Sequence, residues 1–155
     1  LGPYGYDVGS ILGVCNFPVI VGDEMWMYYT AMTTTHGGIL PDKVLSIARA
    51  AWRIDGMVSL DAGDEPGIVE TVIFQPEGKN LFVNANVKNG WLKTEVLDSN
   101  GTVIEGYEAC EDSILTQDSV KQRVVWKHQK YLPQGTPLCL RFYLKKGSLF
   151  SYTIE

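Results

Sequence analysis

From about residue 57 to the C-terminus, apolar and polar residues alternate in short runs that are separated by turn sequences. Alternation with a period of two places apolar side chains on one face of a strand, so each run predicts a strand with one buried face. The runs occupy residues 68–74, 81–87, 120–126 and 138–144, and a last one ends at residue 154. Turns are expected at 76–78, 88–90 and 99–101, each ending in glycine. About eight strands at this spacing predict an antiparallel β-sandwich of the jelly-roll kind.

The first third of the chain is typical of a β-meander with longer, more apolar strands. Residues 17–21 and 24–32 flank a Gly22-Asp23 turn and predict a hairpin. Both faces of the 24–32 strand are apolar or aromatic, so we expect it to be buried between two layers. Residues 43–52 predict a further strand, although their Ala-Arg-Ala-Ala stretch also fits a helical turn.

Residues 54–63, Ile-Asp-Gly-Met-Val-Ser-Leu-Asp-Ala-Gly, connect the predicted meander to the predicted sandwich. We expect a turn at Asp55-Gly56, after which Val58 and Leu60 are the first inward residues of the sandwich. The predicted domains are a meander over 1–53 and a β-sandwich accessory domain over 54–155. Three tryptophans, Trp26, Trp52 and Trp126, are predicted to lie in the core.

Composition indicates a globular chain without affinity for membranes or nucleic acids. The 155 residues are 45% hydrophobic and 20% charged, and no apolar run approaches the ~20 residues of a membrane-spanning helix. A net charge of -5 argues against a nucleic-acid partner. One basic cluster alternates with apolar residues and is interpreted as the solvated face of a strand; it comprises Lys121, Arg123, Lys127, His128 and Lys130.

Motifs of catalysis or metal binding are missing from the sequence. It contains no G-x-S-x-G elbow and no glycine-rich phosphate loop, and two histidines are too few for a His-rich metal centre. The three cysteines, Cys15, Cys110 and Cys139, show no CxxC spacing, so their redox state is open. Asp61, Asp64 and Glu65 are interpreted as an acidic turn, with a structural calcium ion as the alternative. We therefore expect no metal and no cofactor.

Several segments, taken in order, resemble a known family. They are residues 17–29, 46–49, 53–63, 80–86, 95–98, 119–127 and 149–152. Together they are similar to the C-terminal part of five-bladed β-propeller glycoside hydrolase family 32-like proteins. The resemblance implies that residues 1–53 end the last propeller blade and that a β-sandwich closes the chain. It also implies an exported protein. The chain starts abruptly with Leu1 instead of Met, and we expect it to be a piece of a longer protein.

The resemblance brings no catalytic residues, because the family's nucleophile and general acid lie on earlier blades. Retaining hydrolysis needs two carboxyl groups about 5–5.5 Å apart. Asp7 and His36 occupy places where a propeller would point polar residues toward its central pocket. Each is a candidate for sugar contact, and the alternatives are a turn or cap aspartate and a plain loop histidine.

The sandwich has its own candidates for sugar binding. Exposed aromatic rings stack on the apolar face of a pyranose, and the candidates are Trp91, Tyr107, Tyr131 and Tyr143, with packing as the alternative for each. We therefore expect a non-catalytic C-terminal β-sandwich module of a carbohydrate-active protein, which supports the structure or binds glycan. The alternative is the closing fragment of a glycosidase, with Asp7 and His36 lining its pocket. The expected partners are carbohydrate, upstream propeller blades or a second copy of the chain.

Overall fold

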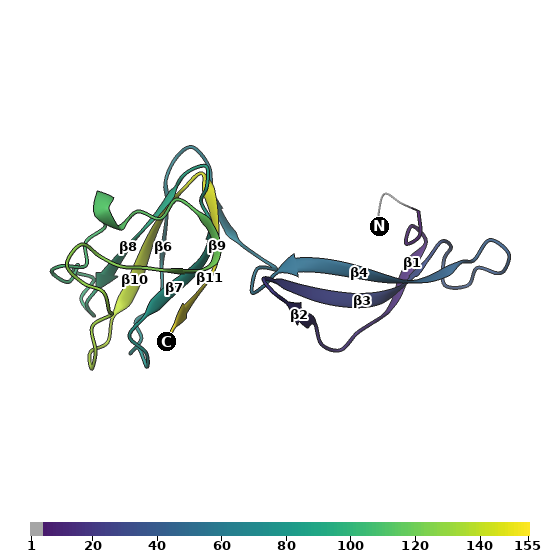
Figure 1. The fold of residues 1–155 in the computed structure, drawn as a ribbon, viewed down its shortest axis with the longest axis horizontal. Helices are drawn as coiled ribbons and strands as arrows, with labels where there is room; N and C mark the ends of the chain where they lie inside the picture. Colours follow the sequence, from purple (N-terminus) through teal and green to yellow (C-terminus); the bar gives the residue numbers. More distant parts are fainter. Residues whose placement is uncertain (1–4) are drawn as a thin grey trace. The chain divides into compact units, whose positions relative to one another are not determined.

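A computed structural model describes residues 5–155, and the protein is all-β (Figure 1). The chain divides into two compact units, residues 1–54 and 55–155, which we describe separately. Apart from one short 3-10 turn, η1 (Glu111–Ser113), the regular structure of the described residues consists of antiparallel strands. No helix within residues 5–155 is long and apolar enough to cross a membrane.

The first unit is a four-stranded sheet built around one long central strand, β3 (Glu24–Met32). One edge of β3 pairs along its whole length with β4 (Leu45–Arg53). The other edge pairs with β1 (Ser10–Val14) and β2 (Val19–Val21). The predicted hairpin is confirmed, and Gly22 supplies a positive φ of 59° at its turn. Residues 45–53 form a strand and not a helical turn.

The expectation that β3 is buried between two layers is wrong for the described chain. Within residues 5–54 the strands form a single sheet, and only Ala31, Met32 and Ala48 are buried hydrophobic residues there. Trp52 is 37% exposed, so its assignment to the core is also wrong. Trp26 is half-buried, with the guanidinium of Arg49 3.9 Å from its ring centroid. The faces of this sheet are apolar as the sequence predicts, but no second layer among residues 5–54 covers them.

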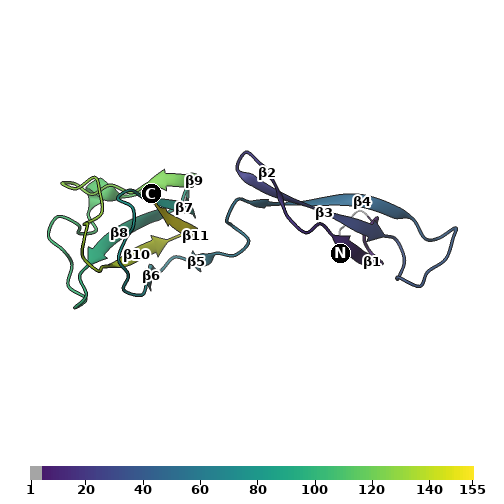
Figure 2. The same cartoon turned by 90° about the horizontal axis from the view of Figure 1, so that it is seen from below.

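The second unit is a sandwich of two antiparallel sheets (Figure 2). One sheet has the order β5-β11-β7-β9, with bounds Leu60–Ala62, Gly147–Ile154, Leu81–Asn86 and Asp118–Arg123. The other has the order β6-β10-β8, with bounds Gly67–Glu70, Cys139–Lys145 and Trp91–Leu97. Every connection from β5 to β11 leads from one sheet to the other, as expected for a jelly-roll-like sandwich. An isolated bridge between Leu92 and Leu115 stands beside β8, where a further strand would lie.

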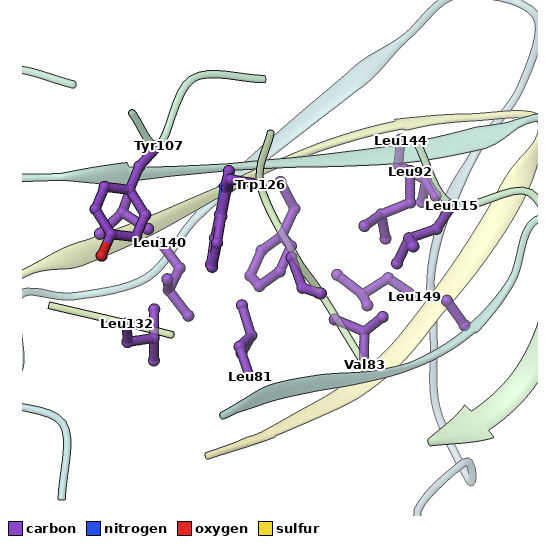
Figure 3. Close-up of a cluster of buried hydrophobic side chains, with 14 of the residues drawn as sticks. Leu81, Val83, Leu92, Tyr107, Leu115, Trp126, Leu132, Leu140, Leu144 and Leu149 are labelled. Carbon is purple, nitrogen blue, oxygen red and sulfur yellow. The ribbon is translucent and has the colours of Figure 1, made fainter. Parts of the chain in front are cut away.

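The core lies between these sheets, and β7, β8 and β10 contribute many of its fully buried side chains (Figure 3). Leu81 and Val83 of β7 and Leu140 and Phe142 of β10 are at most 1% exposed. Trp126 is 4% exposed, which confirms its predicted place in the core. Its indole Nε1 donates a hydrogen bond to the carbonyl of Thr94 over 2.8 Å, so the polar group of the ring is satisfied on burial.

Two sequence-based predictions about the start of the sandwich need correction. Val58 and Leu60 are 79% and 55% exposed, because β5 is the outermost strand of its sheet and no strand of residues 5–155 lies beyond it. The run 68–74 forms a strand only as far as Glu70, and Phe74 makes an isolated bridge with Leu138. The basic residues Lys121 and Arg123 of β9 are exposed, as predicted.

Candidate functional site

The strongest candidate site is the outer face of the sheet β6-β10-β8. Along β8, Leu92, Thr94 and Val96 are buried in alternation, and Leu97 at the end of the strand is buried as well. The alternate residues Trp91, Lys93 and Glu95 are only partly buried and point away from the core. Along β10 the same alternation buries Leu140, Phe142 and Leu144 and turns Arg141 and Tyr143 outward. The sequence-predicted residues Trp91 and Tyr143 therefore lie on one face. We call this surface the β8–β10 face, and it comprises Glu70, Trp91, Lys93, Glu95, Arg141 and Tyr143.

Three charged residues form one row across the middle of the β8–β10 face. Arg141 is directly opposite Glu70 on β6 and Glu95 on β8. Its guanidinium donates to Glu70 Oε1 over 2.5 Å and to Glu95 Oε2 over 3.2 Å. The hydrogen bond with Glu70 is the main reason that the pKa of Arg141 lies above its usual value. Arg141 is thus a fixed cation, held from both sides by carboxylates.

Tyr143 belongs to the same hydrogen-bonded network. Its hydroxyl donates to Glu95 Oε2 over 2.9 Å, and the second carboxylate oxygen of Glu95 accepts from the backbone N–H of Ala109 over 3.4 Å. Burial, followed by the hydrogen bond with Glu95, raises the pKa of the Tyr143 hydroxyl. The Glu95 side chain is only 13% exposed, so its oxygens are committed to the protein and fix the phenol ring in place.

Trp91 lies next to this network, at the start of β8. It is opposite Lys145, which makes it a diagonal neighbour of Tyr143 on the same face, at a spacing of about 7–8 Å. The ammonium of Lys93 lies 5.0 Å from its ring centroid and also pairs with Glu111. The preceding Gly90 is closely packed, since an added Cβ would lie 1.8 Å from the carbonyl oxygen of Lys145. The position of Trp91 is therefore fixed by the fold.

The β8–β10 face combines the two kinds of group that a hydroxyl-rich ligand needs. The half-buried rings of Trp91 and Tyr143 offer apolar surface, and Lys93 and Arg141 lie beside them as charged hydrogen-bond donors. Because both carboxylates are held by the same guanidinium, this network is already satisfied without a ligand. Its chemistry suits the binding of a ligand to a pre-formed surface.

Tyr107 does not belong to this surface, and its selection as a ligand-binding residue is corrected. It is 7% exposed and packs edge-on against Trp126, with ring centroids 5.0 Å apart (Figure 3). Its hydroxyl donates to the carbonyl of Tyr131 over 2.8 Å, and burial raises its pKa. A ring enclosed in this way has no open face on which a sugar could stack. Tyr131 is 46% exposed, and Lys79 and Arg123 lie 4.9 and 5.2 Å from its ring centroid.

Asp7 and His36, the two candidates of the first unit, occupy different environments. Asp7 is 4% exposed and accepts a hydrogen bond over 3.0 Å from the hydroxyl of Tyr29 on β3. Burial is the main cause that raises the pKa of Tyr29 to about 12, and the hydrogen bond with Asp7 adds to it. His36 is exposed in the loop between β3 and β4, and its carbonyl accepts from Lys43 Nζ over 2.7 Å.

The cysteines and the acidic turn form no further site. Cys15, Cys110 and Cys139 are all free thiols, and Cys139 is buried, with its Sγ donating to the carbonyl of Thr71. Asp64 pairs with Lys146 over 2.6 Å, and Asp61 accepts from the hydroxyl of Ser59. Within residues 5–155 no three His, Cys, Asp or Glu side chains come together as metal ligands.

Glu70, Glu95 and Arg141 are the residues that sequence analysis did not find as a group. Each is a charged residue at an outward position of a strand, which by itself indicates only a solvated face. Their contact depends on β10 lying between β6 and β8, which are the second and fourth strands of the sandwich in chain order. Only the strand order brings them together.

Comparison with known proteins adds no relative: no protein-family model, no curated protein and no solved structure matches this chain. The fold and the β8–β10 face thus define its class, an all-β protein whose antiparallel jelly-roll-like sandwich follows a β-meander.

Proposed function

We propose that this chain is a non-catalytic β-sandwich module of a carbohydrate-active protein, and that its β8–β10 face binds glycan. The observation that carries the proposal is the diagonal placement of Trp91 and Tyr143 beside the Arg141–Glu95 pair. Aromatic rings give stacking surface, and fixed charged groups next to them hydrogen-bond to sugar hydroxyls. The resemblance of the sequence to glycoside hydrolase family 32-like proteins agrees with this ligand class.

The proposal includes a second, structural role, in which the chain packs against other parts of a larger protein. The sandwich follows a meander that exposes many apolar residues, among them Phe17 between β1 and β2 at 81% and Ile47 of β4 at 85%. Exposed apolar surface of this extent marks an interaction site, and the partner is upstream blades of a longer protein or a second copy. The alternative role, as the closing fragment of a glycosidase pocket, would require Asp7 and His36 to contact the sugar.

The glycan-binding role is tested by affinity electrophoresis of the chain in gels that contain neutral β-linked or fructan polysaccharides. We expect one class of polysaccharide to retard the chain, and Trp91→Ala or Tyr143→Ala to weaken that retardation at least about tenfold. The matched control is Tyr131→Ala, which removes an exposed tyrosine outside the β8–β10 face and should leave retardation unchanged. Retardation that survives both site variants would overturn the proposal.

A further inference from the structure

One edge of the sandwich carries most of its exposed apolar side chains. Between residues 55 and 73 six large hydrophobic residues are at least 54% exposed: Met57, Val58, Leu60, Ile68, Val72 and Ile73. From residue 74 to the C-terminus the exposed large hydrophobics are Val125, Tyr131 and Tyr152, at 39%, 46% and 40%. A concentration of this kind marks an interaction surface, since scattered single residues are the norm elsewhere.

A groove between the two sheets lies at this edge, and two of these six residues, Val58 and Leu60, line it. The groove has a volume of about 440 Å³, with Val58 and Leu60 along the β5 side and Val69 and Thr71 along the β6 side. Its wall also includes Phe142 and Leu149, which belong to the core. The groove is therefore an extension of the hydrophobic core that reaches the surface.

The edge of β5 next to this groove has no partner strand in the described part of the chain. β5 is the terminal strand in the order β5-β11-β7-β9. Leu60 is opposite the buried Leu149, so Leu60 and Val58 point toward the groove, and Asp61, opposite Ser148, points to the outer face. A strand added beside β5 would place alternate side chains over the groove and the remaining ones next to Asp61.

The charge of this segment indicates which residues the added strand would carry on its outer face. Residues 55–77 include Asp55, Asp61, Asp64, Glu65, Glu70 and Glu77 and no lysine or arginine. Arg141 pairs with Glu70, and Lys146 pairs with Asp64. Asp61, the outward residue at the middle of β5, accepts hydrogen bonds from the hydroxyls of Ser59 and Ser148. Basic side chains would complement it.

We propose that the edge of β5 binds an extended polypeptide segment in which apolar residues alternate with lysine or arginine. The segment adds a fifth strand to the sheet, its apolar residues fill the groove, and its basic residues lie beside Asp61. This mode of recognition combines main-chain hydrogen bonds with alternating side-chain pockets. β5 is favoured over the neighbouring edge strand β6 because the outward carboxylate of β6, Glu70, is already paired with Arg141.

The test is fluorescence polarisation of labelled peptides with the whole 155-residue chain. One peptide alternates valine and lysine, a second alternates valine and glutamate, and a third has the composition of the first in two blocks. We expect the alternating lysine peptide to bind at least about tenfold more tightly than the other two. Asp61→Lys should reverse the preference between lysine and glutamate peptides, and Val58→Lys should abolish binding of both.

Val125→Lys is the matched control, because it also places lysine at an exposed valine of the sandwich and should leave binding unchanged. Val58 is 79% exposed, so its replacement leaves the core intact. Equal binding of the alternating and block peptides, or an unchanged preference in Asp61→Lys, would overturn the proposal. The proposal would also be overturned if no peptide binds and the chain instead self-associates in a way that Val58→Lys suppresses. The occupant of the β5 edge would then be a second copy of the chain.

Discussion

The hydroxyl of Tyr143 lies 2.9 Å from Oε2 of Glu95, the same carboxylate oxygen that accepts a hydrogen bond from Arg141. The two side chains come from neighbouring strands and lie two positions apart in the register, with the Phe142–Thr94 pair between them. Glu95 thus connects the aromatic part of the β8–β10 face to its charged part. Because the carboxylate is 13% exposed, these hydrogen bonds form largely away from water, where an unpaired partner is costly.

Replacement of Glu95 by alanine should therefore destabilise the sandwich by about 1–3 kcal/mol, since Tyr143 and Ala109 lose their acceptor. Urea denaturation measures this loss. Asp112→Ala is the control, because Asp112 and its partner Lys127 are each 59% exposed and such a surface ion pair contributes little. An equal effect of the two substitutions would contradict the structural role of Glu95.

Gly90→Ala should also destabilise the sandwich, by about 1–3 kcal/mol. The added methyl group would lie 1.8 Å from the carbonyl oxygen of Lys145, so the turn before Trp91 must move away from β10. Gly63→Ala is the matched control, because its Cβ would meet no atom within 4 Å. Thermal unfolding of both variants tests the prediction, and a Gly90→Ala variant as stable as Gly63→Ala would refute it.

Asp98 should make the stability of the sandwich depend on pH in the acid range. Its carboxylate accepts hydrogen bonds from the backbone N–H groups of Thr102 and Asn100, which lower its pKa. A lowered folded-state pKa contributes stability above the ordinary aspartate pKa, and this contribution disappears as pH falls through the folded value. We expect Asp98→Asn to be less stable than the parent at pH 7 and to approach it in acid.

Urea denaturation of both proteins from pH 7 downward measures this difference. Glu77→Gln is the control, since it removes an exposed carboxylate near a different turn. A stability difference between parent and Asp98→Asn that stays constant, or grows, on acidification would show that the turn hydrogen bonds are not the source of the effect.

The apolar meander of the first unit should cause self-association of the isolated chain. On β4, Leu45 and Ile47 are 61% and 85% exposed, and no strand of residues 5–54 pairs with its outer edge. An exposed apolar edge strand is a template for pairing with another chain. Sedimentation velocity should detect oligomers that Ile47→Lys reduces and Val125→Lys does not. A strictly monomeric parent with residues 17–52 disordered would count against this.

The sequence predicted the fold better than it predicted which surfaces are covered. Alternation identified β7, β9 and β10 of the sandwich, and Gly22 in the meander and Gly101 in the sandwich mark turns, because these signals are local. β1 was not predicted, since Gly13 at φ 59° lies in a bulge that interrupts its pattern. The exposure of Val58 and Leu60 was not predictable either, because a strand's place at a sheet edge depends on strand order.

In the candidate site, too, features set by neighbouring residues could be predicted from the sequence, and features set by contacts between distant segments could not. Trp91 and Tyr143 could be selected from their positions beside a turn and beside outward charged residues. Tyr107 has a similar polar neighbourhood in sequence, with Glu105 and Glu108 nearby, yet it packs on Trp126 from a distant segment. Its burial is set by that contact and not by its neighbours in the chain.

Binding of glycan to the β8–β10 face can be followed residue by residue in an NMR titration of the ¹⁵N-labelled chain. The ligand is an oligosaccharide derived from the polysaccharide that retards the chain most in affinity electrophoresis. We expect the largest amide shifts at Trp91, Lys93, Glu95, Arg141 and Tyr143, together with a shift of the indole N–H of Trp91. Shifts confined to the surroundings of Asp7 and His36, or no shifts at all, would contradict glycan binding at this face.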